Sequence, residues 1–353
     1  EFMVKKRPTS LVTGGAGFIG SHVTDHVLAL GHRVVVLDDL SGGFERNVPK
    51  DATFIKGSIN DITLLEELFE EYEFDYVYHL AAYAAEGLSY FIRNFNYMNN
   101  LVGSVNLINQ AVKNDVKRFV FTSSIAVYGS GQTPMVETLV PAPEDPYGIS
   151  KFAVEMDLKS AHKVFGLEYT IFRPHNVYGP RQHHGDTYRN VLGIFVNKTM
   201  NKEPVTVFGD GMQTRAFSDI DDVAPHIARC VEMPKTVNEI YNIGADKPYT
   251  VIELAETIAD AMGESYGIIH YPARKEVVHA YSDHTKANKT FGIKKTVSLK
   301  DGVEKMVTWS KEIGPLEPTR YDAVEIERNM PPSWKQLLDE SKRQNSKKAK
   351  KKK

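Results

Sequence analysis

The 353-residue chain contains a single cysteine, Cys230, which excludes an internal disulfide framework. So little cysteine is typical of a reducing compartment, and we expect a cytoplasmic location. No apolar run reaches the roughly eighteen residues of a membrane span, and no signal-type apolar segment precedes the first expected strand. Because Cys230 lies in a helical pattern, we expect it in the core and not as a nucleophile.

Neither sign of charge is in large excess, since the formal net charge is only −2. The distribution is uneven, however, because residues 342–353 hold eight Lys or Arg and no acid. The rest of the chain is therefore acidic, and we expect its folded body not to bind nucleic acid. Residues 346–353 are expected to be a disordered basic tail. A nuclear-import signal and a contact with an anionic surface are the other two interpretations of this run.

A glycine-rich turn stands between a β-branched run and an amphipathic stretch. Residues 10–13 predict a strand and residues 18–30 a helix. Between them, Gly14 permits a sharp turn, Gly17 lets the backbone approach a pyrophosphate, and Gly20 lets the helix lie close to the strand. The helix N-terminus adds free amides and the positive end of its dipole. The pattern predicts a dinucleotide site, although ordinary βα turns also use glycine.

Strand-like runs alternate with helical patterns through the first half of the chain. Strands are expected at residues 10–13, 33–37, 52–55, 75–80 and 118–122, and helices at 18–30, 62–72 and 99–114. Buried strands that alternate with helices predict an α/β fold, a Rossmann-type doubly wound parallel sheet. After about residue 172, prolines and glycines interrupt further helical patterns at 187–200, 219–232, 251–262 and 299–309.

Four segments follow from this alternation. We expect a mainly dinucleotide-binding domain over 3–180, a smaller, mainly substrate-binding C-terminal lobe over 181–330, a terminal helix over 331–345, and the tail over 346–353. The chain can cross between the first two parts. Ser333 with Gln336 predicts a capping box at the start of the terminal helix. Trp334, Leu337 and Leu338 would form its docking face.

A carboxylate, Asp38, ends the second expected strand, eighteen positions after Gly20. A carboxylate at this place accepts hydrogen bonds from the adenosine ribose hydroxyls and repels a 2′-phosphate. Asp38 therefore predicts NAD rather than NADP as the cofactor. The alternative is that Asp38 and Asp39 only cap a loop.

Tyr147 and Lys151 are four residues apart and share one face of a helix. An ammonium near a phenol stabilises the phenolate and lowers its pKa, so that tyrosine can act as a base near neutral pH. Ser124, which follows the strand at 118–122, can hydrogen-bond the same substrate hydroxyl. Taken alone, an exposed i,i+4 pair would explain the Tyr and Lys equally well.

Together these stretches resemble the extended short-chain dehydrogenase/reductase superfamily, and within it the nucleotide-sugar 4-epimerases. The resemblance covers about residues 10–309. Its motifs stand in the family's order: Thr13-Gly14-x-x-Gly17-x-x-Gly20, Leu80-Ala81-Ala82, Asn100, Ser123-Ser124, Tyr147-x-x-x-Lys151, Arg173-Pro174-x-Asn176-Val177-Tyr178-Gly179-Pro180, and Val207-Phe208-Gly209-Asp210-Gly211 with Arg215.

The resemblance implies a role for each matching position. The NAD site would consist of Gly14, Gly17, Phe18, Ile19, Asp38, Ser58, Ile59, Leu80, Ala81, Ala82, Asn100, Tyr147 and Lys151. The catalytic set would be Ser124, Tyr147 and Lys151, and no metal is implied. The UDP-sugar would meet Ser124, Tyr147, Asn176, Val207, Arg215, Arg274, Glu276 and Ala280. Two arginines suit a diphosphate because the planar guanidinium matches its oxygens, although surface pairing would also explain them.

One position departs from the family pattern. Family members carry Gly-Asp-Ile or Gly-Asp-Leu after the third strand, where the acid meets the adenine amino group, whereas this chain has Gly57-Ser58-Ile59. A serine hydroxyl accepts that bond more weakly, so we expect a looser hold on the adenine. Asp61 is expected only to cap the next helix.

The residues after the catalytic serine bear on the reaction. Dehydratases of the family place Asp-Glu there and decarboxylases a glutamate, but this chain has Ile125-Ala126, which supply no proton chemistry. The resemblance therefore implies epimerisation, in which Tyr147 takes the 4-hydroxyl proton and the cofactor lends and recovers a hydride. A 4-keto reductase, a dehydratase, a UDP-glucuronate 4-epimerase and a non-catalytic NAD sensor are the rivals.

The sugar is harder to assign from the sequence. Alignment on Glu276 places the small Ala280 beside the 2-position of the sugar, which would admit an N-acetyl group. A one-residue deletion would place Tyr281 there instead, so UDP-N-acetylglucosamine/galactosamine and UDP-glucose/galactose both remain. Glu86 either faces the sugar or caps a turn. The family also implies a homodimer through helices at 99–114 and 147–165.

Overall fold

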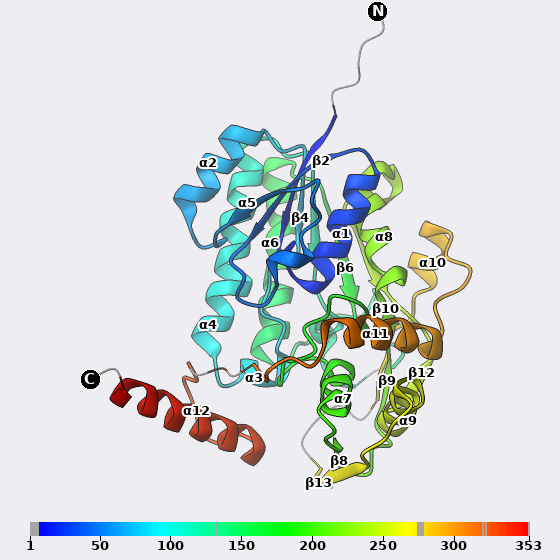
Figure 1. Cartoon of the computed structure of the whole chain (residues 1–353). Coiled ribbons are helices and arrows are strands. Elements are labelled where there is room, and N and C mark those ends of the chain that lie inside the picture. Colours follow the sequence, from blue (N-terminus) through cyan, green and yellow to red (C-terminus); the bar gives the residue numbers. More distant parts are fainter. Residues whose placement is uncertain (1–6, 132, 274–278, 320, 322, 352–353) are drawn as a thin grey trace, which may run out of the picture.

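The centre of the molecule is a parallel sheet of seven strands in the order β11-β6-β5-β4-β1-β2-β3. The computed structural model describes residues 7–351, except 132, 274–278, 320 and 322 (Figure 1). The strands are β1 (Thr9–Thr13), β2 (Arg33–Asp38), β3 (Thr53–Lys56), β4 (Tyr76–His79), β5 (Arg118–Thr122), β6 (Tyr169–Pro174) and β11 (Glu239–Ile243). The chain order reverses between β1 and β4, so the Rossmann-type doubly wound fold is confirmed.

Helices cover both faces of this sheet, as Figure 1 shows. On one face lie α2 (Ile62–Tyr72), α5 (Gly103–Lys113) and α6 (Pro146–Phe165). On the other lie α1 (Phe18–Ala29), α8 (Ala224–Arg229) and α10 (Thr285–Phe291). The strands are buried on both faces, which explains their continuous apolar runs.

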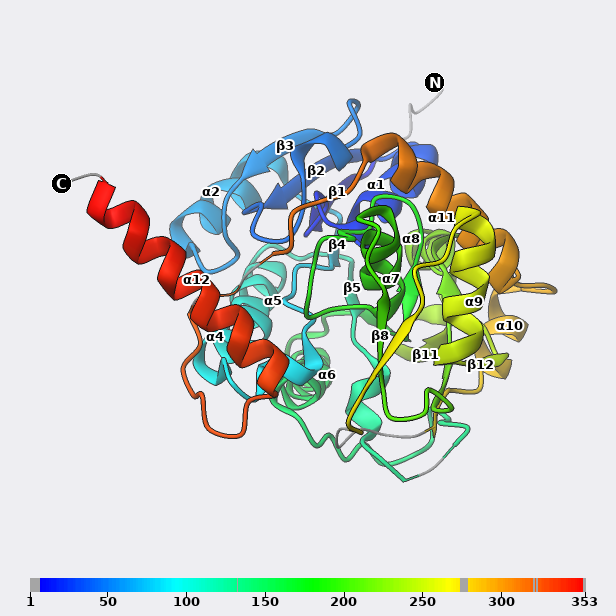
Figure 2. The same ribbon diagram turned by 60° about the horizontal axis from the view of Figure 1, so that its bottom comes forward.

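A second lobe packs at the carboxyl ends of the strands, as the view in Figure 2 shows. Its own apolar core joins α7, α9, α11 and β8. Its elements are β7 (Val177–Tyr178), α7 (Val191–Met200), β8 (Val205–Phe208), β9 (Thr214–Ala216), β10 (Ser218–Asp219), β12 (Pro248–Thr250), α9 (Val251–Met262), β13 (Ile268–Tyr271), β14 (His279–Ala280) and α11 (Leu299–Ile313). Two short helices, α3 (Glu86–Ser89) and α4 (Arg93–Tyr97), follow β4.

The chain crosses between the two parts, as the sequence left open. Strand β11 pairs with β6 at the edge of the main sheet, although it lies within the expected lobe segment 181–330. The helices α8 and α10 likewise pack on the main sheet. Strands β6 and β11 were both missed from the sequence, because the β-branched and aromatic residues of each stand beside Pro, Asn or Gly.

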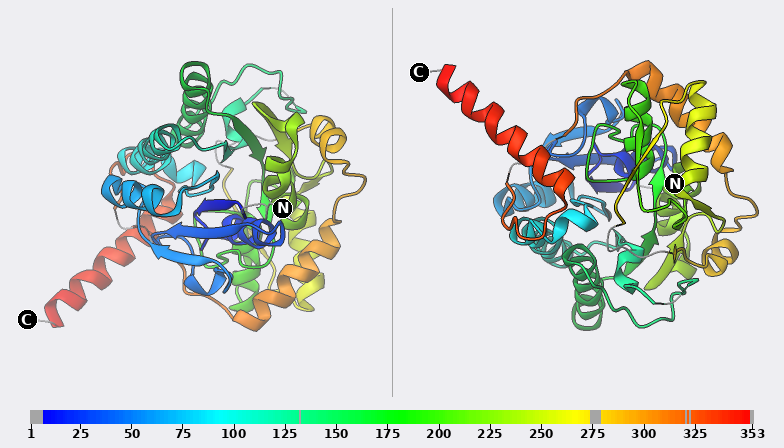
Figure 3. Two further views of the ribbon diagram at one scale, coloured as in Figure 1. Left: turned by 90° about the horizontal axis from the view of Figure 1, so that it is seen from above. Right: turned by 90° about the horizontal axis from the view of Figure 1, so that it is seen from below.

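The C-terminal helix α12 (Pro332–Lys351) is longer than expected. The boundary at residue 345 and the disordered tail are therefore corrected: the helix runs on to Lys351, because Lys, Ala, Gln and Ser follow one another with no Gly or Pro to end it. The views in Figure 3 show α12 projecting from the body. No helix among the described residues is both long and apolar enough to cross a membrane.

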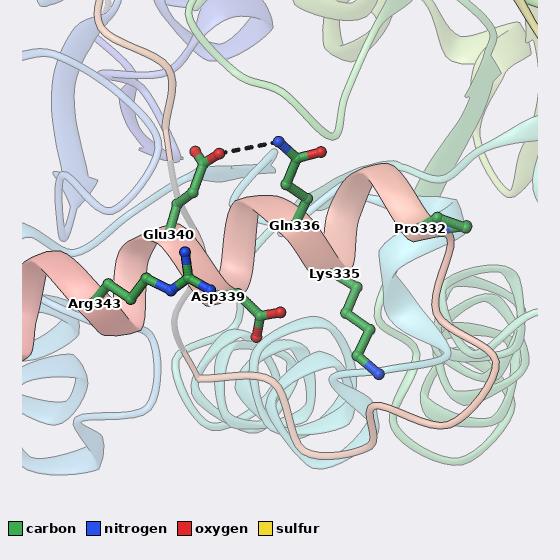
Figure 4. Close-up of a pocket in the computed structure, with 6 residues that line it drawn as sticks. All are labelled: Pro332, Lys335, Gln336, Asp339, Glu340 and Arg343. Carbon is green, nitrogen blue, oxygen red and sulfur yellow. Dashed lines mark hydrogen bonds between the residues drawn. The ribbon is translucent and has the colours of Figure 1, made fainter.

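The expected docking face of α12 is present, but its capping box is not. Trp334 packs edge-on against Tyr188 and Phe91, and Leu338 is buried. Gln336 lies inside the helix and donates to Glu340, with 3.1 Å between Nε2 and Oε1 (Figure 4). Figure 4 shows that the charged residues Lys335, Asp339 and Arg343 line an open hollow beside this helix.

Candidate active site

The glycine turn after β1 is closed tightly by backbone contacts. Gly14 has a φ of +72°, and a Cβ there would lie 2.7 Å from the amide of Ala81 on the neighbouring strand connection. A Cβ on Gly20 would lie 2.0 Å from the Gly14 carbonyl oxygen. Gly17 is the N-cap of α1 and provides no side-chain cap, so the first amides of the helix keep their capacity for an anion.

Asp38 at the end of β2 joins this turn. Its carboxylate accepts hydrogen bonds from the backbone amides of Ala16 (3.0 Å) and Leu40 (2.8 Å). Burial raises the pKa of Asp38, and the two backbone hydrogen bonds oppose that shift. The loop-closing role of Asp38 is therefore present, and its hydrogen bond with a ribose stays a prediction.

The residues expected around the adenine and nicotinamide lie on the next strand ends. Ser58 starts the turn into α2: its Oγ accepts from the amide of Asn60, and Asp61 caps the helix through the amide of Leu64. Ile59 is buried against Gly103. The roles of these residues toward adenine stay predictions, while the helix-capping role of Asp61 is confirmed.

The segment Leu80-Ala81-Ala82 runs beside the glycine turn. The amides of Leu80 and Ala81 donate to the carbonyl oxygen and the hydroxyl of Thr13, at 3.1 and 3.3 Å. Asn100 is buried and bonds the backbone of Tyr83, the residue after Ala82. The Asn100 Oδ1 accepts from the Tyr83 amide, and the Asn100 Nδ2 donates to the Tyr83 carbonyl oxygen. Asn100 thus holds the connection after β4 in place.

Ser124, Tyr147 and Lys151 meet at the carboxyl ends of β5 and the start of α6. Ser124 follows β5, accepts from the amide of Ala126, and hydrogen-bonds the Tyr147 hydroxyl. Lys151, one turn after Tyr147, donates 2.9 Å to the carbonyl oxygen of Thr122. The Lys151 ammonium lies 5.8 Å from the Tyr147 ring centroid. The structure therefore brings the expected catalytic set together.

The expected lowering of the tyrosine pKa by Lys151 is not produced by the protein alone. Burial raises the pKa of Tyr147, and the hydrogen bond with Ser124 opposes it. Burial also lowers the pKa of Lys151 to about 7, with Glu155 opposing. Both groups thus favour their neutral forms, because each is almost wholly removed from water. An ionised tyrosine here needs further positive charge near its hydroxyl.

A buried ion pair below Lys151 was missed from the sequence. Arg173 at the end of β6 forms a bidentate bond with Glu155 of α6, at 2.9 and 2.5 Å. Ser123 donates to Glu155 (2.6 Å), and Arg173 donates to the Tyr128 hydroxyl (2.8 Å). Glu155 lies one turn beyond Lys151, so the spacing Tyr147, Lys151, Glu155 along one helix face was the available signal.

The nucleotide-side residues lie on the second lobe. Arg215 on β9 is half-buried and stands opposite Ala280 of β14 in the strand pairing. Asn176 donates to the carbonyl oxygen of Ala216 (3.3 Å), next to Arg215. The Val207 side chain is packed in the core of the lobe, so only its backbone can face a ligand. Arg274 and Glu276 lie outside the described residues.

Charged side chains from other segments act on the pKa of Tyr147. The negative charge of Glu86, the first residue of α3, raises the pKa of Tyr147, and the positive charge of Arg189 lowers it. Arg189 is held by Asp186 (2.6 Å) and lies 5.0 Å from the Tyr83 ring centroid. The sequence left the role of Glu86 open, and a role toward the sugar stays a prediction. Arg189 was not foreseen.

The residues present fit a bound dinucleotide. The cradle at Gly14 and Gly17 is one that side chains would fill, the α1 amides face it, and Asp38 stands at the end of the adjacent strand. Tyr147 and Lys151 approach from α6 at the same edge of the sheet. Fold and site together define a dinucleotide-dependent enzyme of the short-chain dehydrogenase/reductase type.

Comparison with known proteins identifies the family. Residues 10–244 match the model of the NAD dependent epimerase/dehydratase family. The chain belongs to this family, and NAD is its cofactor.

Individual relatives agree with this assignment. The chain is 36% identical over 306 residues to a putative UDP-glucose 4-epimerase of Methanocaldococcus jannaschii, covering 85% of this chain and 98% of the relative. It is similar to the crystal structure of Thermotoga maritima UDP-glucose 4-epimerase with UDP-glucose, with 35% identity, a TM-score of 0.82, and coverage of 86% and 99%. It also resembles the UDP-N-acetylglucosamine 4-epimerase of Methanobrevibacter ruminantium in complex with UDP-N-acetylmuramic acid, with 30% identity, a TM-score of 0.80, and coverage of 88% and 100%.

Proposed function

We propose that the protein is an NAD-dependent epimerase that inverts C4 of a UDP-sugar through a transient 4-keto intermediate. The observation that carries the proposal is the meeting of Tyr147, Ser124 and Lys151 beside the glycine turn, with no acid in the turn Ile125–Tyr128 that follows Ser124. Elimination or decarboxylation would need an extra acid or base at that place. Epimerisation needs only a group that takes and returns one proton.

In this mechanism Tyr147 removes the proton from the 4-hydroxyl, and Ser124 holds the same oxygen by a hydrogen bond. When bound, NAD supplies the hydride acceptor and donor, and the positive charge of its nicotinamide ring favours the tyrosine phenolate. When protonated, Lys151, one turn further along α6, adds a second positive charge that favours the phenolate. Tyr147 then returns its proton to the rotated sugar.

The nucleotide would be held on the second lobe while the sugar turns. Arg215 and the amide of Asn176 lie on adjoining segments, and a guanidinium suits a diphosphate. Arg274 and Glu276 are proposed from the family pattern alone. Fixing the diphosphate while leaving the hexose unclamped is what allows either face of C4 to meet the cofactor.

For the sugar, we propose UDP-N-acetylglucosamine/galactosamine, UDP-glucose/galactose, or both. Ala280 is half-buried and stands opposite Arg215, and a small side chain there suits an N-acetyl group. The next residue, Tyr281, is tied through its carbonyl oxygen to the amide of Met135 (3.0 Å). The similar proteins include both a UDP-glucose and a UDP-N-acetylglucosamine epimerase.

A uronate is the second candidate substrate, on the strength of Arg189. Its positive charge lowers the pKa of Tyr147, the residue that would take the proton of the sugar 4-hydroxyl. A Bacillus cereus UDP-glucuronic acid 4-epimerase, in complex with UDP-glucuronic acid and NAD, is among the similar structures. Plant UDP-glucuronic acid decarboxylases are also related, but the residues after Ser124 disfavour that reaction here.

We also propose a homodimer that packs through α5 and α6. Exposed apolar side chains lie on α6, at Ile149, Met156, Val164 and Phe165, and directly before α5, at Val102. Such a cluster is typical of an interface. Light scattering at micromolar concentration should give twice the mass of one chain, and a single-chain mass would contradict the proposal.

The reaction is tested by incubating the protein, with NAD and without a reductant, with UDP-glucose, UDP-N-acetylglucosamine and UDP-glucuronate in separate tubes. Proton NMR of the anomeric signals should show conversion of at least one sugar to its 4-epimer. If none converts, the proposed reaction is wrong. Tyr147→Phe should lower kcat about 10³-fold, whereas Tyr90→Phe, whose exposed hydroxyl bonds the Glu144 carbonyl, should leave it unchanged.

A further inference from the structure

Two buried histidines meet ring to ring at the junction of the sheet and the second lobe. His175 follows β6, and His284 precedes α10. The side chains are 4% and 1% exposed. Their Nε2 atoms lie 3.1 Å apart, and their ring centroids lie 5.1 Å apart. Neither histidine belongs to the site described above.

The partners of these rings determine how many protons the pair carries. The Nδ1 of His175 faces the carbonyl oxygen of Ala216 at 2.9 Å, and a carbonyl only accepts, so this nitrogen bears a proton. The Nδ1 of His284 faces Asp246 Oδ1 at 2.5 Å. The pKa of Asp246 is lowered, first by its hydrogen bond with His284, so the carboxylate is ionised and this nitrogen also bears a proton.

The contact between the two Nε2 atoms needs a third proton. Without one, two lone pairs would face each other at hydrogen-bond distance inside a dry site. Three protons on two imidazoles make one positive charge, wherever the shared proton lies. Burial lowers the pKa of His175 to about 3, with the neighbouring His284 adding to the shift. The carboxylate of Asp246 stands beside the other ring, so the charge belongs on His284.

This charged ring connects the segments that form the nucleotide side of the cleft. The Ala216 carbonyl accepts from both His175 and the adjacent Asn176. Ala216 ends β9, which carries Arg215 and pairs with β14. Ser282, two residues beyond β14, contacts His284 Nε2 at 3.0 Å. One imidazolium therefore ties the end of β6, strand β9 and the chain after β14 to Asp246, which follows β11.

We propose that His284 is a doubly protonated positioning residue whose charge, shared with His175 and balanced by Asp246, holds Asn176 and Arg215 in register for the nucleotide of the substrate. The proposal rests on the UDP-sugar function given above. It predicts that His284 affects binding of the nucleotide and not the chemical step, because the pair bonds Ala216, Ser282 and Asp246 and not the catalytic set.

Other charged groups near the pair are turned to different partners. The Asp283 carboxylate bonds the amide and hydroxyl of Thr285. Lys286 pairs with Glu239 at 2.5 Å. At the end of β6, Arg173 is held by Glu155. Glu137 accepts from the amide of Asn242 on β11. Asp246 is thus the acid that faces the pair, among the described residues that bond around it.

The charge is tested directly by ¹⁵N NMR of the full-length protein labelled at histidine. At pH 7 the His284 signals should show protons on both nitrogens, assigned by their loss in His284→Phe. His175 should show a proton on Nδ1. Neutral signals for both rings at pH 7 would overturn the proposal. This measurement depends on no catalytic assay, so it separates a failure of this inference from a failure of the proposed reaction.

The positioning role is tested by calorimetric titration with UDP and by steady-state kinetics. His284→Phe should weaken UDP binding and raise KM about tenfold, with kcat within twofold of the parent protein. His26→Asn, a matched change on α1, should alter neither. Unchanged UDP affinity in a folded His284→Phe protein, or an equal loss in kcat, would overturn the proposal.

A second variant keeps the test decisive if His284→Phe does not fold. The Asp246 side chain is 62% exposed, so Asp246→Asn should fold. Loss of the balancing charge lets His284 give up its second proton more readily. UDP affinity should therefore fall more at pH 8 than at pH 6 in Asp246→Asn, and an unchanged affinity at both pH values would overturn the proposal. A parent protein that binds no UDP, but shows the doubly protonated ring, would contradict the proposed substrate instead.

Discussion

The ammonium group of Lys151 donates a 2.9 Å hydrogen bond to the backbone carbonyl of Thr122, the last residue of β5. This bond fixes the lysine at the strand end next to Ser124, with its charge 4.8 Å from the Phe121 ring centroid. The side chain is 3% exposed, and burial lowers its pKa to about 7. The site therefore holds a lysine that changes charge near neutral pH.

Replacing Lys151 by an apolar residue should raise the thermal stability of the protein and abolish its catalytic activity. The charged form of a lysine with a lowered pKa costs stability below the folded value of about 7, and this cost disappears as pH rises toward the unfolded value near 10.4. Lys151→Met should therefore melt above the parent protein at pH 6, with a gain that shrinks toward pH 10. Calorimetric scans check this. Lys163→Met, on the exposed side of α6, is the control, and a gain independent of pH would contradict the expectation.

Removing the charge of Glu86 should move the pH profile of the reaction. Burial is the main cause of the raised pKa of Tyr147, and the negative charge of Glu86 adds to it. Glu86→Gln should lower that pKa, so the rise of kcat/KM with pH should begin at lower pH. Initial rates from pH 5 to 10 measure the shift. Glu144→Gln should leave the profile in place, and a shift to higher pH for Glu86→Gln would refute the assignment.

Breaking the buried pair of Glu155 and Arg173 should destabilise the protein strongly. Glu155→Gln leaves the Arg173 guanidinium buried, 1% exposed, without its countercharge. We expect a loss of about 3–5 kcal/mol in the free energy of unfolding, measured by urea denaturation. The double variant Glu155→Leu with Arg173→Met should lose less than Glu155→Gln alone. A single variant within 1 kcal/mol of the parent protein, in the same assay, would sink this prediction.

Neutralising Asp38 should weaken the preference for NAD. Asparagine cannot repel a 2′-phosphate and accepts ribose hydrogen bonds less strongly than a carboxylate. Asp38→Asn should raise the Kd for NAD about tenfold and narrow the gap between NAD and NADP, as measured by titration of the cofactor-stripped protein. Asp39→Asn, the exposed neighbour, should change neither constant. An unaltered NAD to NADP ratio in Asp38→Asn would show that this carboxylate only closes the loop.

Local patterns were enough for the first half of the fold and for part of the site. The helix at 62–72 and the strand at 118–122 were predicted at their observed bounds. Periodicity is strong in such segments because each buries one side or both against the sheet. The glycine turn and the Tyr147/Lys151 pair could also be predicted, because each lies within a few residues of chain, where the spacing of the residues determines their geometry.

Other features depend on contacts between distant segments. Strands β6 and β11 are recognisable only once they pair with each other and with β5. The positive charge of Arg189 lowers the pKa of Tyr147 from a loop 42 positions further along the chain. No residue spacing in the sequence predicts this interaction, because it depends on how the folded chain places the loop that carries Arg189.

By itself, the sequence determined that a dinucleotide lies on a glycine turn before α1 and that a tyrosine and a lysine share a face of α6. Those features are set by backbone conformation and by helical spacing over short stretches. The tertiary structure decided the charge of the site. Burial favours the neutral forms of Tyr147 and Lys151. The fold also places Arg173 and Glu155 together in the interior. Both results depend on which distant parts of the chain pack around each group and remove it from water.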